Sequence, residues 1–417
     1  MADLFWPGDE RALKAFDQGD FLETMVQVEH AWLRALQLAG IAPDTDDEST
    51  HGLVHARDLS EIADQAEASG NPVVPLVALM RERLAARDPE AARWLHRGLT
   101  SQDVLDTALV LSARATTALV LEAIDRQVSA LSRLAERHRG DLMAGRTLTQ
   151  HAVPITFGLK AAQWLQGVLD ARDDLRALRF PVQLGGAAGT LAAVTELAGD
   201  SDAALFLVAE TARILHLDRV PSWHTSRAPL TRYADALVRA TDAMGHIAND
   251  VLLLARPEIA ELAEPAVEGR GGSSTMPQKA NPVLSVLIRR AALAAPAQAA
   301  QLHLAAATTL DERPDGSWHT EWTTLASLSR HALTAASQTA ELLAGLHVDT
   351  GRMAGVVKQQ ASALLAERRS IRSLTDAPEA HPSAPSDLDP SHYLGATEAM
   401  IEEILERART PHDQEDL

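Results

Sequence analysis

Apolar positions recur at steps of three and four along the stretch from Asp103 to Arg139, which contains neither proline nor glycine. The positions on this face are Leu109, Ala113, Thr116, Val120, Ile124, Val128, Leu131 and Ala135. Such spacing places the side chains on one side of a helix. We therefore predict one long amphipathic helix here, ended by Gly140.

Four further segments show helical spacing, over residues of about 154–180, 230–256, 282–310 and 321–346. Each is longer than the mean globular helix of about 11 residues. Pro154 is expected in the first turn of its helix, where proline is tolerated. Long helices joined by polar or glycine-rich loops predict a bundle, so the expected fold class is all-α, with three helical regions around a long central bundle.

Breaks in the pattern divide the chain into three predicted domains. Residues 1–103 are read as several short helices separated by polar turns, residues 104–346 as the central long-helix bundle, and residues 347–417 as a short C-terminal helical domain. In the last domain, the proline-rich stretch 377–390 is expected to be irregular, and a final helix is expected over residues 396–409.

The composition supports a folded, helical protein and excludes several classes of function. Hydrophobic residues make up 46% of the chain and aromatic residues only 4%, with alanine and leucine dominant. The net charge of −19 argues against nucleic acid or an anionic membrane as partner, since both need clustered lysine and arginine. The absence of cysteine excludes disulfides, thiolate metal sites and cysteine nucleophiles. We find neither a signal peptide nor an apolar run long enough to span a bilayer, so a cytoplasmic location is expected.

The stretch Gly269–Pro282, reading GRGGSSTMPQKANP, carries the strongest chemical signal. Three glycines lie close together, which costs conformational entropy and is unusual for a rigid structural role. Two serines, Thr275, Lys279 and Asn281 follow them. One interpretation is a lid that brings a serine and a lysine over an anion and excludes water. The other is a plain surface linker between two helices, and the composition leaves both open.

Two further polar joints precede long predicted helices. At His96–Asp106, reading HRGLTSQDVLD, the polar residues 100–102 lie near a helix N-terminus, where they either bind an anion or simply cap the first-turn amides. At Arg146–Pro154, reading RTLTQHAVP, His151 is either an acid or base or one of the structural histidines among the 16 in the chain. No histidine has the partner spacing of a metal site, so no metal is expected.

Together these joints resemble the three regions from which the fumarase/aspartase superfamily builds its active site. The matching stretches are GSSTMPQKANP at 272–282, HRGLTSQD at 96–103 and RTLTQHAVP at 146–154. Further stretches resemble the branch of bacterial 3-carboxy-cis,cis-muconate cycloisomerases, which lactonise a tricarboxylic diene in the β-ketoadipate pathway of protocatechuate degradation. These are GNPVVPLV at 70–77, QLGGAAGTLA at 183–192, ERPDGSWHTEW at 312–322 and LDPSHYLG at 388–395. WHTEW replaces the serine- and arginine-rich stretch of adenylosuccinate lyase, which disfavours a nucleotide substrate.

The resemblance implies proton transfer at a carbon next to a carboxylate, through an aci-carboxylate intermediate that fixed donors and cations stabilise. It assigns Ser273 as the carbon acid/base, activated by the closed loop and by Lys279. It assigns His151 as the second proton-transfer group, or as a residue that orients the attacking carboxylate. The substrate-binding residues that it implies are His96, Thr100, Ser101, Gln102, Arg146, Gln150, Ser274, Met276, Asn281 and His319.

The resemblance also implies a homotetramer with sites shared between subunits, a small polycarboxylate substrate and no cofactor. The region after His347 is shorter than the cycloisomerase pattern, which leaves the substrate open. One alternative is a lyase that breaks a C–N or other C–heteroatom bond of a substituted succinate and releases fumarate, like adenylosuccinate or nitrosuccinate lyase. A non-catalytic helical scaffold is the other, and the intact Ser273, Lys279, Asn281 and His151 argue against it.

Overall fold

The computed structural model describes residues 3–44, 52–272, 275–276, 279–374 and 388–410. The chain forms two compact units, each built from three stretches of sequence. Unit 1 contains Met1–Leu119, Leu175–Val238 and Ala295–Thr334, and unit 2 contains Val120–Asp174, Arg239–Ala294 and Ala335–Leu417.

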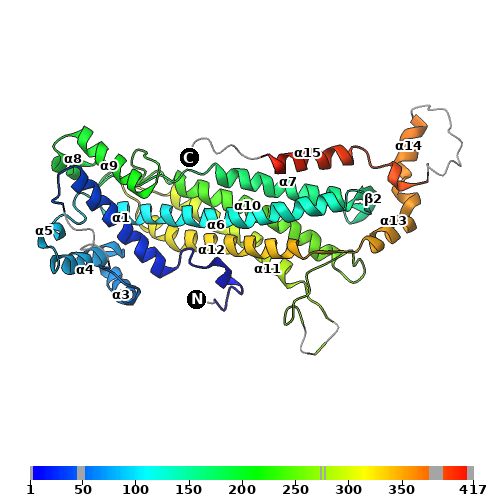
Figure 1. Cartoon of the computed structure of the whole chain (residues 1–417), viewed down its shortest axis with the longest axis horizontal. Coiled ribbons are helices and arrows are strands. Elements are labelled where there is room, and N and C mark those ends of the chain that lie inside the picture. The colour runs from blue at the N-terminus through cyan, green and yellow to red at the C-terminus, as the bar shows by residue number, and fades with distance from the viewer. Residues whose placement is uncertain (1–2, 45–51, 273–274, 277–278, 375–387, 411–417) are drawn as a thin grey trace. The chain divides into compact units, whose positions relative to one another are not determined.

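Long helices dominate the chain, as the spacing of apolar residues predicts (Figure 1). They are α6 (Ser101–Arg137), α7 (Phe157–Arg176), α10 (Ala228–Leu254), α11 (Val283–Ala307) and α12 (Gly316–Ala344). The bounds of α6 lie within two residues of the predicted ones, because its unbroken run of helix-forming residues leaves no competing structure. The mostly helical fold is therefore confirmed.

Unit 1 surrounds the start of α6 with shorter helices. These are η1 (Asp9–Ala12), α1 (Gln18–Leu38), η2 (Ala56–Asp58), α3 (Leu59–Ser69), α4 (Val73–Ala85), α5 (Pro89–Ala92), α8 (Ala192–Ala198) and α9 (Ser201–Leu215). Asp17 caps α1 by accepting from the Gly19 backbone N–H at 2.9 Å. The apolar face of α1, with the fully buried Trp32, packs against α9 and α3 and forms a core for this unit.

A β-hairpin in unit 2, within this mostly helical chain, was not predicted from the sequence. Strands β1 (Leu142–Thr147) and β2 (Gln150–Thr156) pair antiparallel, with Leu148 and Thr149 at left-handed φ values of 50° and 69° in the two-residue turn. Pro154 therefore lies in a strand opposite Ala144, whereas it was expected in the first turn of a helix. The helix begins only at Phe157. A second two-stranded sheet joins β3 (Leu262–Ala263) to β4 (His347–Val348).

The C-terminal stretch of unit 2 contains α13 (Thr350–Leu364), α14 (Ala366–Leu374), η4 (Pro390–His392) and α15 (Thr397–Arg409). Helix α13 packs on the hairpin, where Val357 and Leu364 meet the buried Ala144. Helix α15 confirms the predicted last helix, and Arg407 anchors it through ion pairs to Asp170 and Asp173 of α7. The hairpin is thus covered by the helix that follows the predicted central bundle.

Two helices correct the expectation that no apolar run is long enough to cross a membrane. By length and composition alone, α6 and α11 both meet that criterion. The most apolar window of α6 is 67% buried, whereas that of α11 is 33% buried. The burial of α6 identifies it as a core helix of the fold, since the core helices of soluble proteins have the same composition.

Candidate active site

The N-terminus of α6 is organised by Asp103 and by a contact from outside the helix. Asp103 accepts a hydrogen bond from the backbone N–H of Thr100 at 3.0 Å, which closes the first turn. The hydroxyl of Thr100 does not serve as the cap. It accepts a hydrogen bond from Nη1 of Arg313 at 2.9 Å, from the segment before α12. A cation therefore lies beside a helix N-terminus, where backbone N–H groups favour anions.

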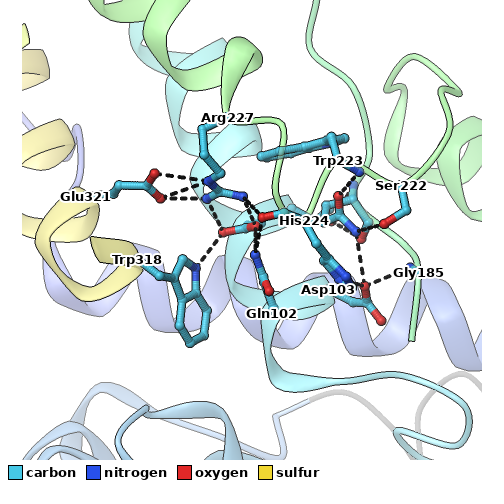
Figure 2. Close-up of polar contacts among 12 residues, drawn as sticks. Gln102, Asp103, Gly185, Ser222, Trp223, His224, Arg227, Trp318 and Glu321 are labelled. Carbon is cyan, nitrogen blue, oxygen red and sulfur yellow. Dashed lines mark hydrogen bonds and ion pairs between the residues drawn. The ribbon is translucent and has the colours of Figure 1, made fainter. Parts of the chain in front are cut away.

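Asp103 also joins this helix end to the glycine-rich joint at 185–189. Its carboxylate accepts from the backbone N–H groups of Gly185 at 2.8 Å and Gly186 at 3.0 Å, and Nε2 of His224 lies 3.0 Å away (Figure 2). Gly185 is closely packed, because a Cβ there would lie 2.3 Å from Oγ of Ser222 and 3.0 Å from the Gly189 backbone, so a larger residue would displace its neighbours. The buried carboxylate of Asp103 thus fixes two loops against the start of α6.

One turn further along α6, Asp106 anchors a buried ionic cluster. Arg227 donates from Nη1 and Nη2 to the two Asp106 oxygens at 2.7 and 3.0 Å, and from Nη2 to Glu321 at 2.6 Å. Trp318 and Gln102 also donate to Asp106, at 2.9 and 3.0 Å. Figure 2 shows Glu321 and Trp318 of α12 turned toward Arg227. The cluster ties α6, the segment before α10 and the start of α12 into one framework.

The cluster contains two carboxylates for one guanidinium. Burial opposes the charge of Arg227, but the attraction of Asp106 and Glu321 outweighs it and holds the Arg227 pKa above its usual range. Burial raises the pKa of Glu321, and the hydrogen bond from Arg227 only partly offsets this. The framework below Thr100 therefore favours a proton on Glu321, which reduces its excess negative charge.

Two predicted site histidines also lie in unit 1. His96 Nδ1 is 2.5 Å from Oε1 of Glu29, a buried residue of α1. His319, in the first turn of α12, contacts the backbone carbonyl of Gly70 through Nε2 at 2.7 Å, and its ring centroid is 4.7 Å from that of Trp322. Gln102, also predicted as a ligand, is fully buried and its amide N–H group donates within the framework.

The hairpin of unit 2 carries the next three predicted residues. His151 and Gln150 are exposed on β2, and Arg146 faces His151 across the pair of strands. Arg146 donates to both oxygens of the buried Glu261, at 2.9 and 2.7 Å. His151 was expected just before a long helix and instead lies six residues before α7, on a strand. In the sequence of the hairpin, His151 is the second residue after the two-residue turn.

The glycine-rich loop is described only in part. The predicted residues Ser273 and Ser274 lie outside the described residues. Asn281 donates to the carbonyl of Gly271 through its backbone N–H and through Nδ2, each at 2.9 Å, and so closes the base of the loop. Lys279 and Met276 are exposed. Gly271 has a φ of 72°, and a Cβ there would lie 2.5 Å from the Asn281 carbonyl oxygen, so the loop base requires glycine.

The structure places the predicted residues in two sets. Those in unit 1 are His96, Thr100, Ser101, Gln102 and His319, and those described in unit 2 are Arg146, Gln150, His151, Met276, Lys279 and Asn281. In the part of the chain that is described, no group of three or more histidine or acidic residues is placed to hold a metal. A cavity of about 640 Å³ in unit 1 is lined by α1 and α9 and includes none of these residues.

Comparisons with known proteins identify the family to which the chain is similar. A family model described as "Lyase" matches residues 28–296. The chain is 40% identical to nitrosuccinate lyase from Streptomyces davaonensis, over 94% of this chain and 91% of that protein. It is 37% identical to 3-carboxy-cis,cis-muconate cycloisomerase from Pseudomonas aeruginosa, over 92% and 91%. The structure resembles 3-carboxy-cis,cis-muconate lactonizing enzyme from Pseudomonas putida, with a TM-score of 0.84, 29% identity, and coverage of 95% and 96%.

Proposed function

The chain belongs to the fumarase/aspartase family of lyases, and we propose that it is a 3-carboxy-cis,cis-muconate cycloisomerase, acting in the cytoplasm on the protocatechuate branch of aromatic catabolism. Support comes from likeness to such enzymes over more than nine-tenths of both chains, in sequence and in structure. The observation that carries the proposal is the anion-attracting end of α6, where Arg313 meets Thr100.

Arg313 determines whether the electrostatic potential at the N-terminus of α6, near Thr100, is positive or negative. The helix supplies roughly half a positive charge at its N-terminus. Asp103 opposes it with a full negative charge, which its donors, His224 among them, spread and partly offset. Arg313 adds a full positive charge and makes no ion pair with a described residue. A substrate carboxylate that reached Thr100 would meet this guanidinium together with the amides of the first turn.

The proposed reaction adds a carboxylate oxygen of the substrate to a double bond of the same molecule. The C–O bond forms, the π electrons move into the neighbouring carboxylate as an aci-carboxylate, and a proton then reaches the adjacent carbon. Ser273 is proposed to deliver that proton. Lys279 and Asn281 are proposed to bind the carboxylate on which charge develops, where a fixed cation has its largest effect. His151 is proposed to orient the attacking carboxylate. No cofactor takes part in this scheme.

A second candidate is a lyase acting on a substituted succinate. The 40% identity to nitrosuccinate lyase favours it specifically. In that reaction Ser273 would remove the proton from the carbon next to the carboxylate, and the bond from the neighbouring carbon to the substituent would break. The electron pair would leave with the substituent, and the product would be fumarate. The same residues serve both reactions, which differ in the group attached to the second carbon.

We also propose that the enzyme works as a homotetramer with sites shared between subunits. Helix α11 leaves large apolar side chains exposed along its length, with Val286 52%, Leu293 71% and Leu304 66% exposed. Such a stripe is costly in water and is expected to be covered by other copies of the chain. A mass measurement in solution at micromolar concentration should give four chains, and a monomer would exclude shared sites.

The two candidates are separated by direct assay of the purified protein. With 3-carboxy-cis,cis-muconate, the cycloisomerase predicts loss of the diene absorbance. If the protein is the lyase, nitrosuccinate should be converted to nitrite and fumarate. In the separate assay with 3-carboxy-cis,cis-muconate, the diene absorbance should then stay unchanged. Ser273→Ala should lower the turnover about 10²–10⁴-fold, whereas Ser129→Ala, at an exposed position on α6, should not change it. Loss of neither substrate would reject both candidates, and an unchanged Ser273→Ala rate would remove Ser273 from its proposed role.

A further inference from the structure

A buried carboxylate stands behind His96, and the proposed reaction does not yet use it. Glu29, on α1, is fully buried, and its Oε1 lies 2.5 Å from Nδ1 of His96. The His96 side chain is 17% exposed, so part of it is accessible to solvent. The two residues are 67 positions apart in sequence, and only the fold brings them together.

The backbone around His96 is held on both sides. His96 has a φ of 61°, a left-handed value that costs free energy in any residue other than glycine. Arg81 donates from Nε and Nη2 to the carbonyl of Leu95, at 3.2 and 2.7 Å. Trp32 donates from Nε1 to the carbonyl of Arg97 at 2.7 Å. The fold therefore maintains a strained conformation that directs the ring onto Glu29.

The chemistry of the pair determines which ring nitrogen carries hydrogen. A carboxylate only accepts hydrogen bonds. Oε2 of Glu29 is buried, and no described residue donates to it, so His96 is the one described side chain that donates to this group. The charge of Arg81 also interacts with Glu29. Nδ1 of His96 must then carry the hydrogen, and Nε2 is left on the opposite side of the ring, where it bonds to no described residue.

We propose that Glu29 is a positioning residue that fixes the tautomer and the direction of the His96 ring, so that Nε2 is presented to the substrate. A carboxylate behind a histidine acts in this way in many enzyme sites, by holding the ring and raising its basicity. The assignment rests on the proposed function only in taking His96 as a residue that contacts substrate. The part played by Glu29 follows from the contacts themselves.

The first test is a double-mutant cycle on the assembled enzyme with the substrate that it turns over. Glu29→Gln should lower kcat/KM about 10- to 100-fold, mainly through kcat. In the His96→Gln background, Glu29→Gln should cause no further loss, because its effect passes through His96. Glu23→Gln, at an exposed position on the same helix, should leave the rate unchanged. Losses that multiply in the double variant would overturn the proposal and assign Glu29 a purely structural role.

The second test needs no activity. Nitrogen NMR of the protein with ¹⁵N-labelled histidine, with the His96 signals identified by their loss in His96→Gln, should show hydrogen on Nδ1. In Glu29→Leu no acceptor remains beside Nδ1, and the preference for hydrogen on Nδ1 should be lost. A wild-type Nδ1 without hydrogen would overturn the proposal. The expected spectra from a protein inactive on both substrates would support the pair and reject the proposed function.

Discussion

Removing the charge of Asp106 should destabilise the protein strongly, although the replacement Asp106→Asn changes one atom. Each oxygen of Asp106 accepts two hydrogen bonds. Oδ1 accepts from Arg227 and Trp318, and Oδ2 accepts from Arg227 and Gln102. An asparagine must place its NH₂ group, which cannot accept, against one of these pairs of donors. In either orientation two hydrogen bonds are lost, and Arg227 loses the carboxylate that accepts from both of its terminal nitrogens.

The size of the effect follows from the burial of the cluster. Breaking a buried ion pair by removing one partner costs about 3–5 kcal/mol, because an uncompensated charge is left behind. The side chains of both Asp106 and Arg227 have no exposed surface, so water cannot substitute for the lost acceptor. Glu321 remains beside Arg227, but its raised pKa makes it the weaker counter-charge. We therefore expect Asp106→Asn to lower the free energy of unfolding by an amount in the upper part of this range.

Urea unfolding followed by the helical circular dichroism signal, at one fixed protein concentration, measures this loss. Glu122→Gln on the same helix is the surface control, since the exposed ion pair of Glu122 with Arg126 contributes only about 0.3–0.5 kcal/mol. A loss for Asp106→Asn no larger than for this control would refute the reasoning.

Within the cluster, Glu321→Gln is the informative comparison, because glutamine resembles the protonated acid. The folded pKa of Glu321 is raised above its unfolded value. Its contribution to stability is therefore fully present below the unfolded pKa of about 4.3 and is lost as the pH rises through the folded pKa. Glu321→Gln should cost less than Asp106→Asn at neutral pH. As the pH falls, the wild type should gain stability relative to Glu321→Gln.

Two further predictions concern other parts of the chain. Hydrogen bonds from Arg83 hold the Asp58 pKa well below its usual range. The stability that they give is therefore present above the unfolded pKa of about 3.9 and is lost as the pH falls. In thermal melts, Asp58→Asn should have a lower melting temperature than the wild type at pH 7, and the difference should vanish in strong acid. A Cβ on Gly245 would lie 2.5 Å from that of Ala292, so Gly245→Ala should lower the free energy of unfolding by about 1–3 kcal/mol. Gly355→Ala, in open space on α13, should raise it by about 0.5–1 kcal/mol, and effects of equal sign at both glycines would contradict the steric explanation.

The long helices could be predicted from the sequence because their signal is local. Helix α6 has a repeating apolar face and no breaker over 37 residues, so neighbouring residues alone determine its extent. The hairpin could not be predicted in the same way. Its turn places Leu148 and Thr149 in left-handed conformations without the glycine or asparagine that marks such turns, and Pro154 resembles the start of a helix. Packing of α13 on the strands, a contact distant in sequence, stabilises them.

The same distinction applies to the site. Thr100 and Ser101 could be placed at a helix N-terminus from the local pattern, and the structure puts them there. From the sequence alone, Asp103 and Asp106 are indistinguishable from ordinary charged residues near the start of a helix. Their partners in the joint before α10 and in α12 lie 121 to 212 residues away along the chain, so no local pattern reveals that the two aspartates are buried. The available signal was their spacing of three residues beside apolar neighbours, which places both on one helix face.

The charge pairs also bear on how a chain with a net charge of −19 could attract a polycarboxylate. Screening limits the reach of exposed charges to about 8 Å at physiological salt, so the distant acids matter less than the cations beside the ligand. Arg146, predicted as a ligand from its position in a motif, has both of its terminal nitrogens committed to Glu261. Arg313 lies in the matching stretch 312–322 but was not predicted as a ligand, and among the described residues it donates only to the neutral hydroxyl of Thr100. A positive charge that no carboxylate neutralises is worth more to an anion than one already paired. We therefore expect Arg313, rather than Arg146, to bind a carboxylate of the substrate.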